Sequence, residues 1–313
     1  MSSISAKKGN KNSLIELMRF LFALWVLYYH GYVPFRTSGW SNGFLAVEFF
    51  FILSGFYLVR SIDKYKDASI KKGLPDFLKH RFIAIAVPFL INEVFVLYYS
   101  IVVNRSPINF FFGFLWYIRD LFIAMAAIFL LRRLIKNEKV FYIILCALSL
   151  LALFGFWWIP MMAWPSGPFR SIAAMPIGMI AALIPKLKAK KDDVKKSAPN
   201  IILIAVGLIV SATSCFLIAS SETKSPFIIY LLVMLIYPAL LYFASCVKIN
   251  NSFLNWLGTL SFPIYAFQCP LRVLERYGVN DSMHLFIILV IMVLCYSAIT
   301  ECLKWRKIKK TTT

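Results

Sequence analysis

The sequence predicts an all-α, polytopic membrane bundle of about ten transmembrane helices with both termini in the cytoplasm. Three observations lead to this prediction. Hydrophobic residues make up 60% of the 313 residues, and the mean hydropathy of +0.75 is well above that of an ordinary soluble domain. Apolar windows long enough to cross a bilayer recur along almost the whole chain. The 34 Lys and Arg residues gather in clusters between those windows, as they do in cytoplasmic loops.

The apolar windows divide the chain into expected helices joined by polar loops. They are residues 14–33, 43–59, 82–103, 110–131, 140–158, 171–184, 200–220, 226–247, 253–271 and 283–303. The least regular are short, or are interrupted by Pro176 or Pro263, which cannot donate a helical hydrogen bond. Residues 14–303 are therefore expected to form one integral-membrane domain between two basic cytoplasmic tails, residues 1–13 and 304–313.

The basic residues support this arrangement of helices. With the N-terminus inside, the segments assigned to the cytoplasm hold most of the 34 Lys and Arg residues. The outer loops hold only Arg36, Arg105, Arg170, Lys224, Arg272 and Arg276. The net charge of +20 is thus explained by loops at a membrane surface, and no nucleic-acid partner is expected. The partner is the lipid bilayer, and the location is a cell membrane, with a bacterial plasma membrane favoured.

The six cysteines indicate neither a disulfide framework nor a metal site. None of them forms a CxxC pair, and nearly all lie within apolar windows. They are expected to be small buried hydrophobic residues, and no metal is expected.

Three ionisable residues lie within the first two expected helices. Arg19 and His30 are eleven residues apart, which places them on one helix face about 16 Å apart along the axis. Glu48 lies near the start of the next helix, at a depth similar to that of His30. Ionisable groups within hydrocarbon cost several kcal/mol, so they mark candidate functional sites.

His30 is the first candidate for acid–base chemistry, because an imidazole exchanges its proton near neutral pH. Glu48 is expected to orient His30 and to stabilise its protonated form. Arg19 and Arg81 are expected on the cytoplasmic side, where guanidinium groups bind phosphates in a bidentate manner. The plainer alternatives are an interfacial histidine, an arginine that reaches the membrane surface, and an isolated carboxylate at the bilayer edge.

Further candidates lie in the fourth and ninth expected helices. Arg119 and Asp120 are adjacent and are expected to face separate partners, because neighbouring residues point in different directions on a helix. Arg119 is a candidate either for the wall of a site or for pairing with an intramembrane carboxylate. Trp116, Tyr117 and Tyr265 are candidates for stacking on a sugar, and a lipid-facing or core role for them is equally open.

Several segments resemble the membrane-bound acyltransferase-3 family. They are R-x10-H from Arg19 to His30, GFLAVEFFFILSGF (43–56), RFIAIAVP (81–88), LWYIRDLF (115–122) and LGTLSFPIYAFQCPL (257–271). These segments occur in the family's order through most of the chain. The resemblance implies transfer of an acyl group, commonly acetyl from acyl-CoA, to a hydroxyl of a surface glycan or glycolipid. No bound cofactor is implied, because acyl-CoA is the donor substrate.

The resemblance also implies roles for individual residues. His30 matches the family's essential histidine, and Arg19 matches the arginine of the same motif. Glu48 matches the acidic residue before two phenylalanines. Arg81 matches an arginine of the cytoplasmic segment that meets the phosphates of the donor. Gln268 stands where the family usually has a histidine in the ninth helix.

The sequence also departs from the family pattern, and alternatives to acyl transfer remain. Ala46 replaces a glycine, while Ala84 and Ile85 lie where another arginine is common. No G-x-S-x-G elbow is present, so direct transfer with His30 as general base is favoured over a serine acyl-enzyme. The main alternative is a glycan or lipid transporter or flippase that uses the same intramembrane charges. A non-catalytic subunit of an envelope-assembly complex is a third reading.

Overall fold

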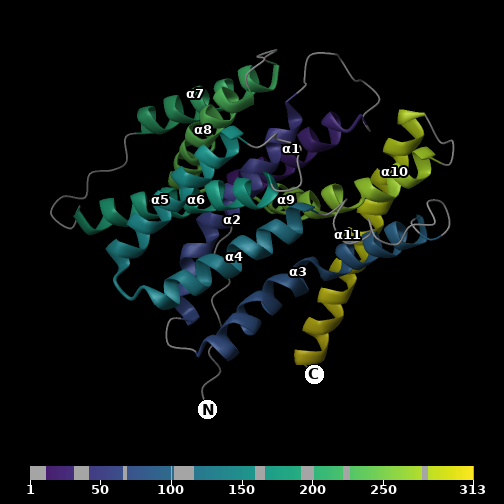
Figure 1. Ribbon diagram of the computed structural model, residues 1–313. Coiled ribbons are helices and arrows are strands. Elements are labelled where there is room, and N and C mark those ends of the chain that lie inside the picture. Colours follow the sequence, from purple (N-terminus) through teal and green to yellow (C-terminus); the bar gives the residue numbers. More distant parts are fainter. Residues whose placement is uncertain are drawn as a thin grey trace.

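The computed structural model describes residues 12–31, 42–65, 69–99, 101, 116–158, 166–191, 201–220, 226–276 and 281–312. Every regular element in these ranges is helical, so the predicted all-α fold is confirmed (Figure 1). The helices are α1 (Ser13–Tyr29), α2 (Ala46–Ile62), α3 (Ile70–Tyr99), α4 (Trp116–Leu134), α5 (Glu138–Trp158), α6 (Ser166–Lys191), α7 (Ile201–Ser220), α8 (Pro226–Cys246), α9 (Ser252–Ala266), α10 (Gln268–Arg276) and α11 (Ser282–Thr312). Two 3-10 helices, η1 (Gly43–Leu45) and η2 (Asp63–Tyr65), flank α2.

Length and composition identify the membrane-spanning elements. Among the described helices, five contain windows long and apolar enough to cross a bilayer: Glu138–Gly155, Gly167–Ile184, Ile201–Ile218, Ile228–Cys246 and Ser282–Leu303. Shorter apolar helices cover Gly43–Val59 and Ile85–Val94. The chain is therefore a polytopic helical membrane protein.

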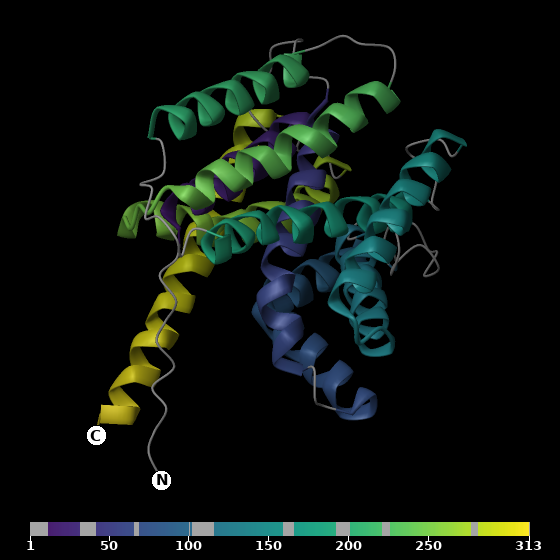
Figure 2. The same ribbon diagram turned by 90° about the vertical axis from the view of Figure 1, so that its left-hand side faces the viewer.

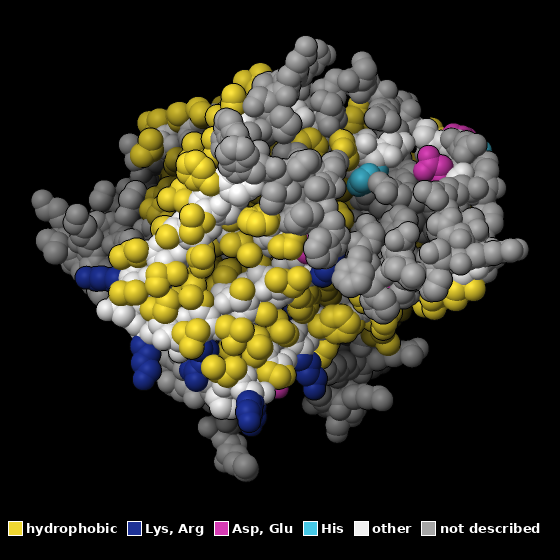
Figure 3. Space-filling model, in the orientation of Figure 1, with side chains coloured by type: hydrophobic (Ala, Val, Ile, Leu, Met, Phe, Trp, Pro, Cys, Tyr) yellow, Lys and Arg dark blue, Asp and Glu magenta, His cyan; other side chains and the backbone are white. Residues whose placement is uncertain are grey.

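The surface has the distribution expected for a bilayer. In Figure 3, hydrophobic side chains are spread widely over the described face, most Lys and Arg side chains lie toward its lower edge, and a His and the most visible acidic side chains lie at the upper right. Large apolar residues of α7 are mostly exposed, with 75% of Ile202 accessible. The expectation that the cysteines are buried is wrong for Cys146, Cys295 and Cys302. Their outward faces meet hydrocarbon, where a thiol needs no burial in protein.

Several helices differ from their predicted ranges for local reasons. α3 begins at Ile70 rather than at residue 82, because a helix can continue beyond the bilayer; its added turns include Gly73 and Pro75. α6 begins at Ser166, with Pro168 in the first turn, where a missing N–H is tolerated. The expected helix 253–271 is divided at Phe267 into α9 and α10.

That division follows from the sequence around Pro270. In a continuous helix, Pro270 would leave the carbonyl of Ala266 without its donor. With the break at Phe267, Pro270 falls instead in the first turn of α10. The N–H of Phe267 closes α9 by donating to the carbonyl of Pro263 at 2.9 Å.

The end of α1 fixes the backbone position of His30. The helix ends at Tyr29, earlier than the predicted residue 33, and His30 is its C-cap. Gly31 follows with φ of 82°, a left-handed conformation that glycine adopts without steric cost. The N–H of His30 donates to the carbonyl of Val26 at 3.2 Å, and that of Gly31 donates to the carbonyl of Tyr28 at 3.0 Å.

The helices α1 and α9 lie side by side and run in the same direction. At their starts, the N–H of Ser13 donates to the carbonyl of Ile249 at 3.0 Å, and Asn12 Nδ2 donates to the carbonyl of Val247 at 2.7 Å. Further along, Leu27 of α1 packs in one cluster with Phe267. The start of α1 therefore lies on the same side as the segment that contains Lys248, as the charge distribution predicts.

The helices α2 and α6 cross at two glycines. A Cβ on Gly55 would lie 2.0 Å from the carbonyl oxygen of Met175, and a Cβ on Gly178 would lie 1.8 Å from the carbonyl oxygen of Ile52. Each glycine therefore allows the backbone of the other helix to approach, as small residues do in membrane bundles.

We expect Gly178→Leu to destabilise the protein by about 3 kcal/mol or more, because a backbone oxygen cannot move away as a flexible side chain can. Thermal unfolding of the purified protein in detergent measures this loss. Ala205→Leu on the exposed face of α7 is the matched control and should leave the melting temperature unchanged. Equal melting temperatures for the two variants would show that the crossing is not tight.

Candidate functional site

A cavity of ≈ 430 Å³ lies within the bundle between α1, α2, α3, α4 and α9. Most of its wall is apolar or aromatic, and its cationic side chains are Arg19 from α1 and Arg81 from α3. Its volume falls within the range of roughly 300–1,000 Å³ that is usual for small-molecule sites. The structure thus brings together two arginines that are far apart in the sequence. In the orientation that the charge distribution predicts, this level of the bundle lies toward the cytoplasm.

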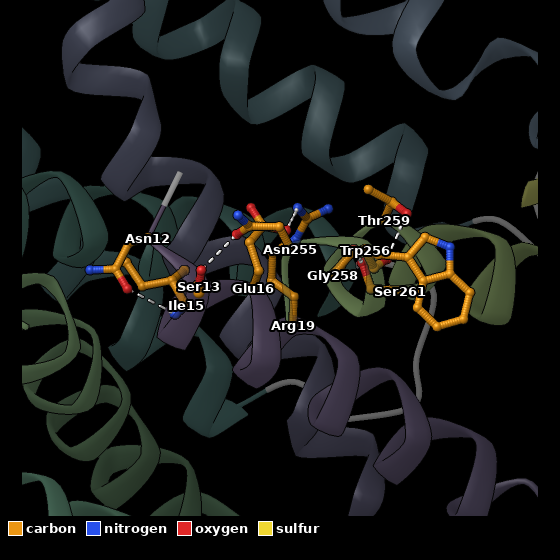
Figure 4. A network of polar contacts seen from close by, with 10 residues as sticks. All are labelled: Asn12, Ser13, Ile15, Glu16, Arg19, Asn255, Trp256, Gly258, Thr259 and Ser261. Carbon is orange, nitrogen blue, oxygen red and sulfur yellow. Dashed lines mark hydrogen bonds and ion pairs between the residues drawn. The ribbon is translucent and has the colours of Figure 1, made fainter. Parts of the chain in front are cut away.

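Arg19 is held by a carboxylate that was not among the predicted site residues. Its Nη1 lies 2.7 Å from Glu16 Oε2, one turn earlier on α1, and Glu16 is only 4% exposed (Figure 4). Gly258 of α9 packs directly on Glu16, since a Cβ there would lie 2.0 Å from the carboxylate oxygen. Ser261, one turn further along α9, lines the cavity. Glu16 and Arg19 are three residues apart on a helix, and this spacing predicts that their side chains can pair.

Arg81 is anchored by polar and aromatic contacts. It donates from Nη2 to Ser61 Oγ and from Nη1 to the carbonyl of Phe77 at 3.2 Å. Its guanidinium carbon lies 3.9 Å above the ring of Phe77. No carboxylate is paired with Arg81 among the described residues. Its positive charge is therefore available to an anionic ligand in the cavity.

Tyr117 and Tyr265 form the predicted aromatic wall. Both line the cavity, and their ring centroids lie 5.5 Å apart in an edge-to-face arrangement. Ser54 of α2 also lines the cavity and hydrogen-bonds to Tyr117. Both residues lie at the level of the arginines, and their predicted role in stacking on a sugar acceptor stays a prediction.

Glu48 takes part in a buried ion pair with Arg170 of α6. The two side chains are 0% and 3% exposed, and Arg170 also donates to the carbonyl of Phe44 at 3.2 Å. The hydroxyl of Tyr230 on α8 donates to Glu48 Oε2 at 3.3 Å. Within the described chain these groups, not His30, bind the carboxylate. The orienting role of Glu48 toward His30 therefore stays a prediction.

Arg170 was assigned to an outer loop, and its buried pairing was missed. Pro168 could have indicated this position, because proline is favoured in the first turn of a helix. A helix that begins near Pro168 includes Arg170.

The expectation that Arg119 and Asp120 face separate partners is wrong. Arg119 Nε lies 2.7 Å from Asp120 Oδ1, and its Nη2 lies 3.0 Å from Oδ2. The arginine side chain is long enough to fold back onto its neighbour, and Asp120 is completely buried. Trp116 stacks under Arg170, with the guanidinium carbon 4.7 Å from the ring centroid. Neither Arg119 nor Trp116 is among the residues that line the cavity.

His30 and Gln268 lie beyond the cavity, toward the opposite end of the bundle. His30 is half-buried at the end of α1, with its ring 5.3 Å from that of Tyr29. Gln268, at the start of α10, is 5% exposed. Arg19 and His30 thus occupy different levels of one helix, about 16 Å apart. Among the described residues, no cluster of His, Cys, Asp and Glu is arranged to hold a metal ion.

These features define a polytopic membrane protein with a cationic, aromatic-walled cavity open to an anionic ligand. The chain belongs to the acyltransferase-3 family: a family model described as an acyltransferase domain matches residues 12–302. No curated protein and no solved structure matches the chain. The predicted family is confirmed, and the protein is a membrane acyltransferase.

Proposed function

We propose that this protein transfers an acetyl group from cytoplasmic acetyl-CoA to a hydroxyl of a surface glycan or glycolipid, with His30 as general base. The observation that supports this most is the cavity lined by Arg19 and Arg81 on separate helices. Two guanidinium groups in an apolar cavity suit the phosphates of a nucleotide-linked donor. The apolar and aromatic wall suits the extended arm that carries the thioester.

The two depths along α1 then have different roles in the reaction. The phosphates bind near Arg19 and Arg81, while the thioester extends toward His30, about 16 Å further along the helix. A donor that enters from the cytoplasm thereby meets an acceptor that approaches from the other side. This arrangement requires no movement of the acceptor across the membrane.

The chemistry needs one base and a leaving group. His30 accepts the proton of the acceptor hydroxyl as its oxygen attacks the thioester carbonyl carbon. The C–O bond forms, the C–S bond breaks, and the sulfur of CoA takes the proton back from the imidazolium. The products are an acetyl ester and free CoA, and the imidazole returns to its starting state.

We expect Arg81→Leu to raise the KM for acetyl-CoA about 10–100-fold with little change in kcat, because a charge-assisted hydrogen bond contributes about 1.5–3 kcal/mol. Arg81 is the better choice than Arg19, whose removal would leave Glu16 buried and unpaired. The assay uses the purified full chain in lipid nanodiscs, with acetyl-CoA and glycan extracted from cells that lack the protein. Arg81→Lys should retain part of the affinity.

The matched control is Lys72→Leu, an exposed cation at the start of the same helix. It should leave both kinetic constants unchanged. If the unaltered protein transferred no acetyl group under these conditions, but moved glycan across vesicles without acetyl-CoA, the transporter alternative would replace the proposal.

A further inference from the structure

Three helices that line the cavity run in the same direction and continue past it. The cavity touches α1 at Arg19, α3 at Arg81 and α9 at Ser261. The direction of α3 follows from its contacts: Arg81 binds Ser61 at the inner end of α2, whereas Ile91 packs with the cluster that contains Leu27 of α1. Residues beyond the cavity on these helices therefore lie at the level of His30.

On α3, this level is occupied by Asn92. Asn92 follows Arg81 by eleven residues, the same spacing that separates Arg19 from His30, so it lies on the same helix face as Arg81. Asn92 is completely buried, and its Oδ1 has no hydrogen-bond partner in the described part of the chain. Its Nδ2 makes only a 3.4 Å contact with Oε1 of Glu93, and Glu93 Oε2 is also unpaired among these residues.

On the α9–α10 segment, the same level is occupied by Gln268. It follows Ser261 by seven residues, about two helical turns. Gln268 is 5% exposed, and its Nε2 lacks a partner among the described residues. The helix α10 packs against α3, and Phe267 belongs to the cluster that Ile91 contacts. Asn92 and Gln268 thus lie on two packed helices at the depth of His30.

Unpaired buried amide groups destabilise a fold. The cost is larger in a bundle surrounded by hydrocarbon than in a solvated loop, because no water can complete the hydrogen bonds. Their presence on packed helices indicates that a ligand completes their hydrogen bonds. The unpaired set contains acceptors at Asn92 and Glu93 and a donor at Gln268. A sugar hydroxyl both donates and accepts, so it matches this set. An anion does not, because it has no hydrogen to donate to the acceptors at Asn92 and Glu93.

We propose that Asn92, Glu93 and Gln268 form the binding site for the hydroxyl groups of a sugar acceptor beside His30. This inference rests on the proposed function, since it supplies the acceptor half of the same reaction. It separates the two substrates by chemistry: cations hold the donor at one level, and neutral or acidic hydrogen-bonding groups hold the acceptor at the other.

The test measures both substrates with the purified full chain in nanodiscs, using acetyl-CoA and glycan from cells that lack the protein. We expect Asn92→Leu and Gln268→Leu each to raise the KM for the glycan at least tenfold and to change the KM for acetyl-CoA less than twofold. Their melting temperatures should change little, because each change removes an unpaired polar atom and Asn92 gives up only its long 3.4 Å contact with Glu93. A merely structural role predicts a lower melting temperature instead.

The matched control is Asn255→Leu at the inner end of α9, where the amide accepts a hydrogen bond from Ser13 at 3.0 Å. It should lower the melting temperature and leave the KM for the glycan unchanged. An unchanged glycan KM in both Asn92→Leu and Gln268→Leu, with active unaltered protein, would overturn the acceptor site alone. Absence of transfer by the unaltered protein would overturn the proposed function together with this inference.

Discussion

Replacement of His30 by alanine is expected to reduce acetyl transfer to the surface glycan by roughly 10²–10⁴-fold, the contribution typical of a general base. The fold should survive. His30 is half-buried at a helix cap, its cap hydrogen bond uses the backbone N–H, and its φ of −76° suits alanine. The affinity for acetyl-CoA should be retained, because Arg19 lies about 16 Å away along α1 and Arg81 lines the same cavity as Arg19.

The measurement is mass spectrometry of the surface glycan from cells in which the variant replaces the native protein. Loss of the acetyl mass increment at equal protein level is the expected result. His284→Ala is the matched control, since His284 is 71% exposed and pairs with Asp281 at the start of α11. Undiminished acetylation in His30→Ala cells would exclude His30 as the base, whatever the control shows.

Breaking the Glu48–Arg170 pair is expected to have the largest effect on stability. Glu48→Leu leaves a buried guanidinium without its counter-charge, and Arg170→Met leaves a buried carboxylate. Each single change should cost about 3–5 kcal/mol, as removal of one partner of a buried pair does. The pair also ties α2 to α6, so its loss acts on the crossing that Gly55 and Gly178 allow.

The double variant Glu48→Leu/Arg170→Met should recover most of that stability, because no unpaired charge remains and the apolar side chains fill a similar volume. Thermal unfolding of the four proteins in detergent gives the coupling energy. Lys139→Met, an exposed cation at the start of α5, is the control for loss of a positive charge. Additive losses in the double variant would show that the pair does not act as a unit.

The same double variant tests the role of Glu48 in chemistry. If the carboxylate orients His30, the stable double variant should still transfer acetyl slowly. If Glu48 is structural only, the recovery of stability should restore the rate as well. Glycan acetylation by the double variant at equal protein level distinguishes the two roles.

The sequence by itself determined the features that depend on local composition and period. Apolar windows and clustered Lys and Arg give the class of fold and its orientation, because transfer into hydrocarbon and the charge of loops are properties of segments. The register of one helix places Arg19 and His30 on one face at two depths, whatever surrounds them. The ordered motifs gave the family, which the match over residues 12–302 confirms.

Only the tertiary structure decided which distant residues meet. The pairing of Glu48 with Arg170, the cavity shared by Arg19 and Arg81, and the packing of α10 on α3 all join segments far apart in the chain. No local period encodes these contacts, because they depend on how close two helices approach and on the angle at which they cross. Here Gly55 on α2 and Gly178 on α6 allow the two backbones to approach closely. The buried charges on these helices can pair only when the helices are packed in this way.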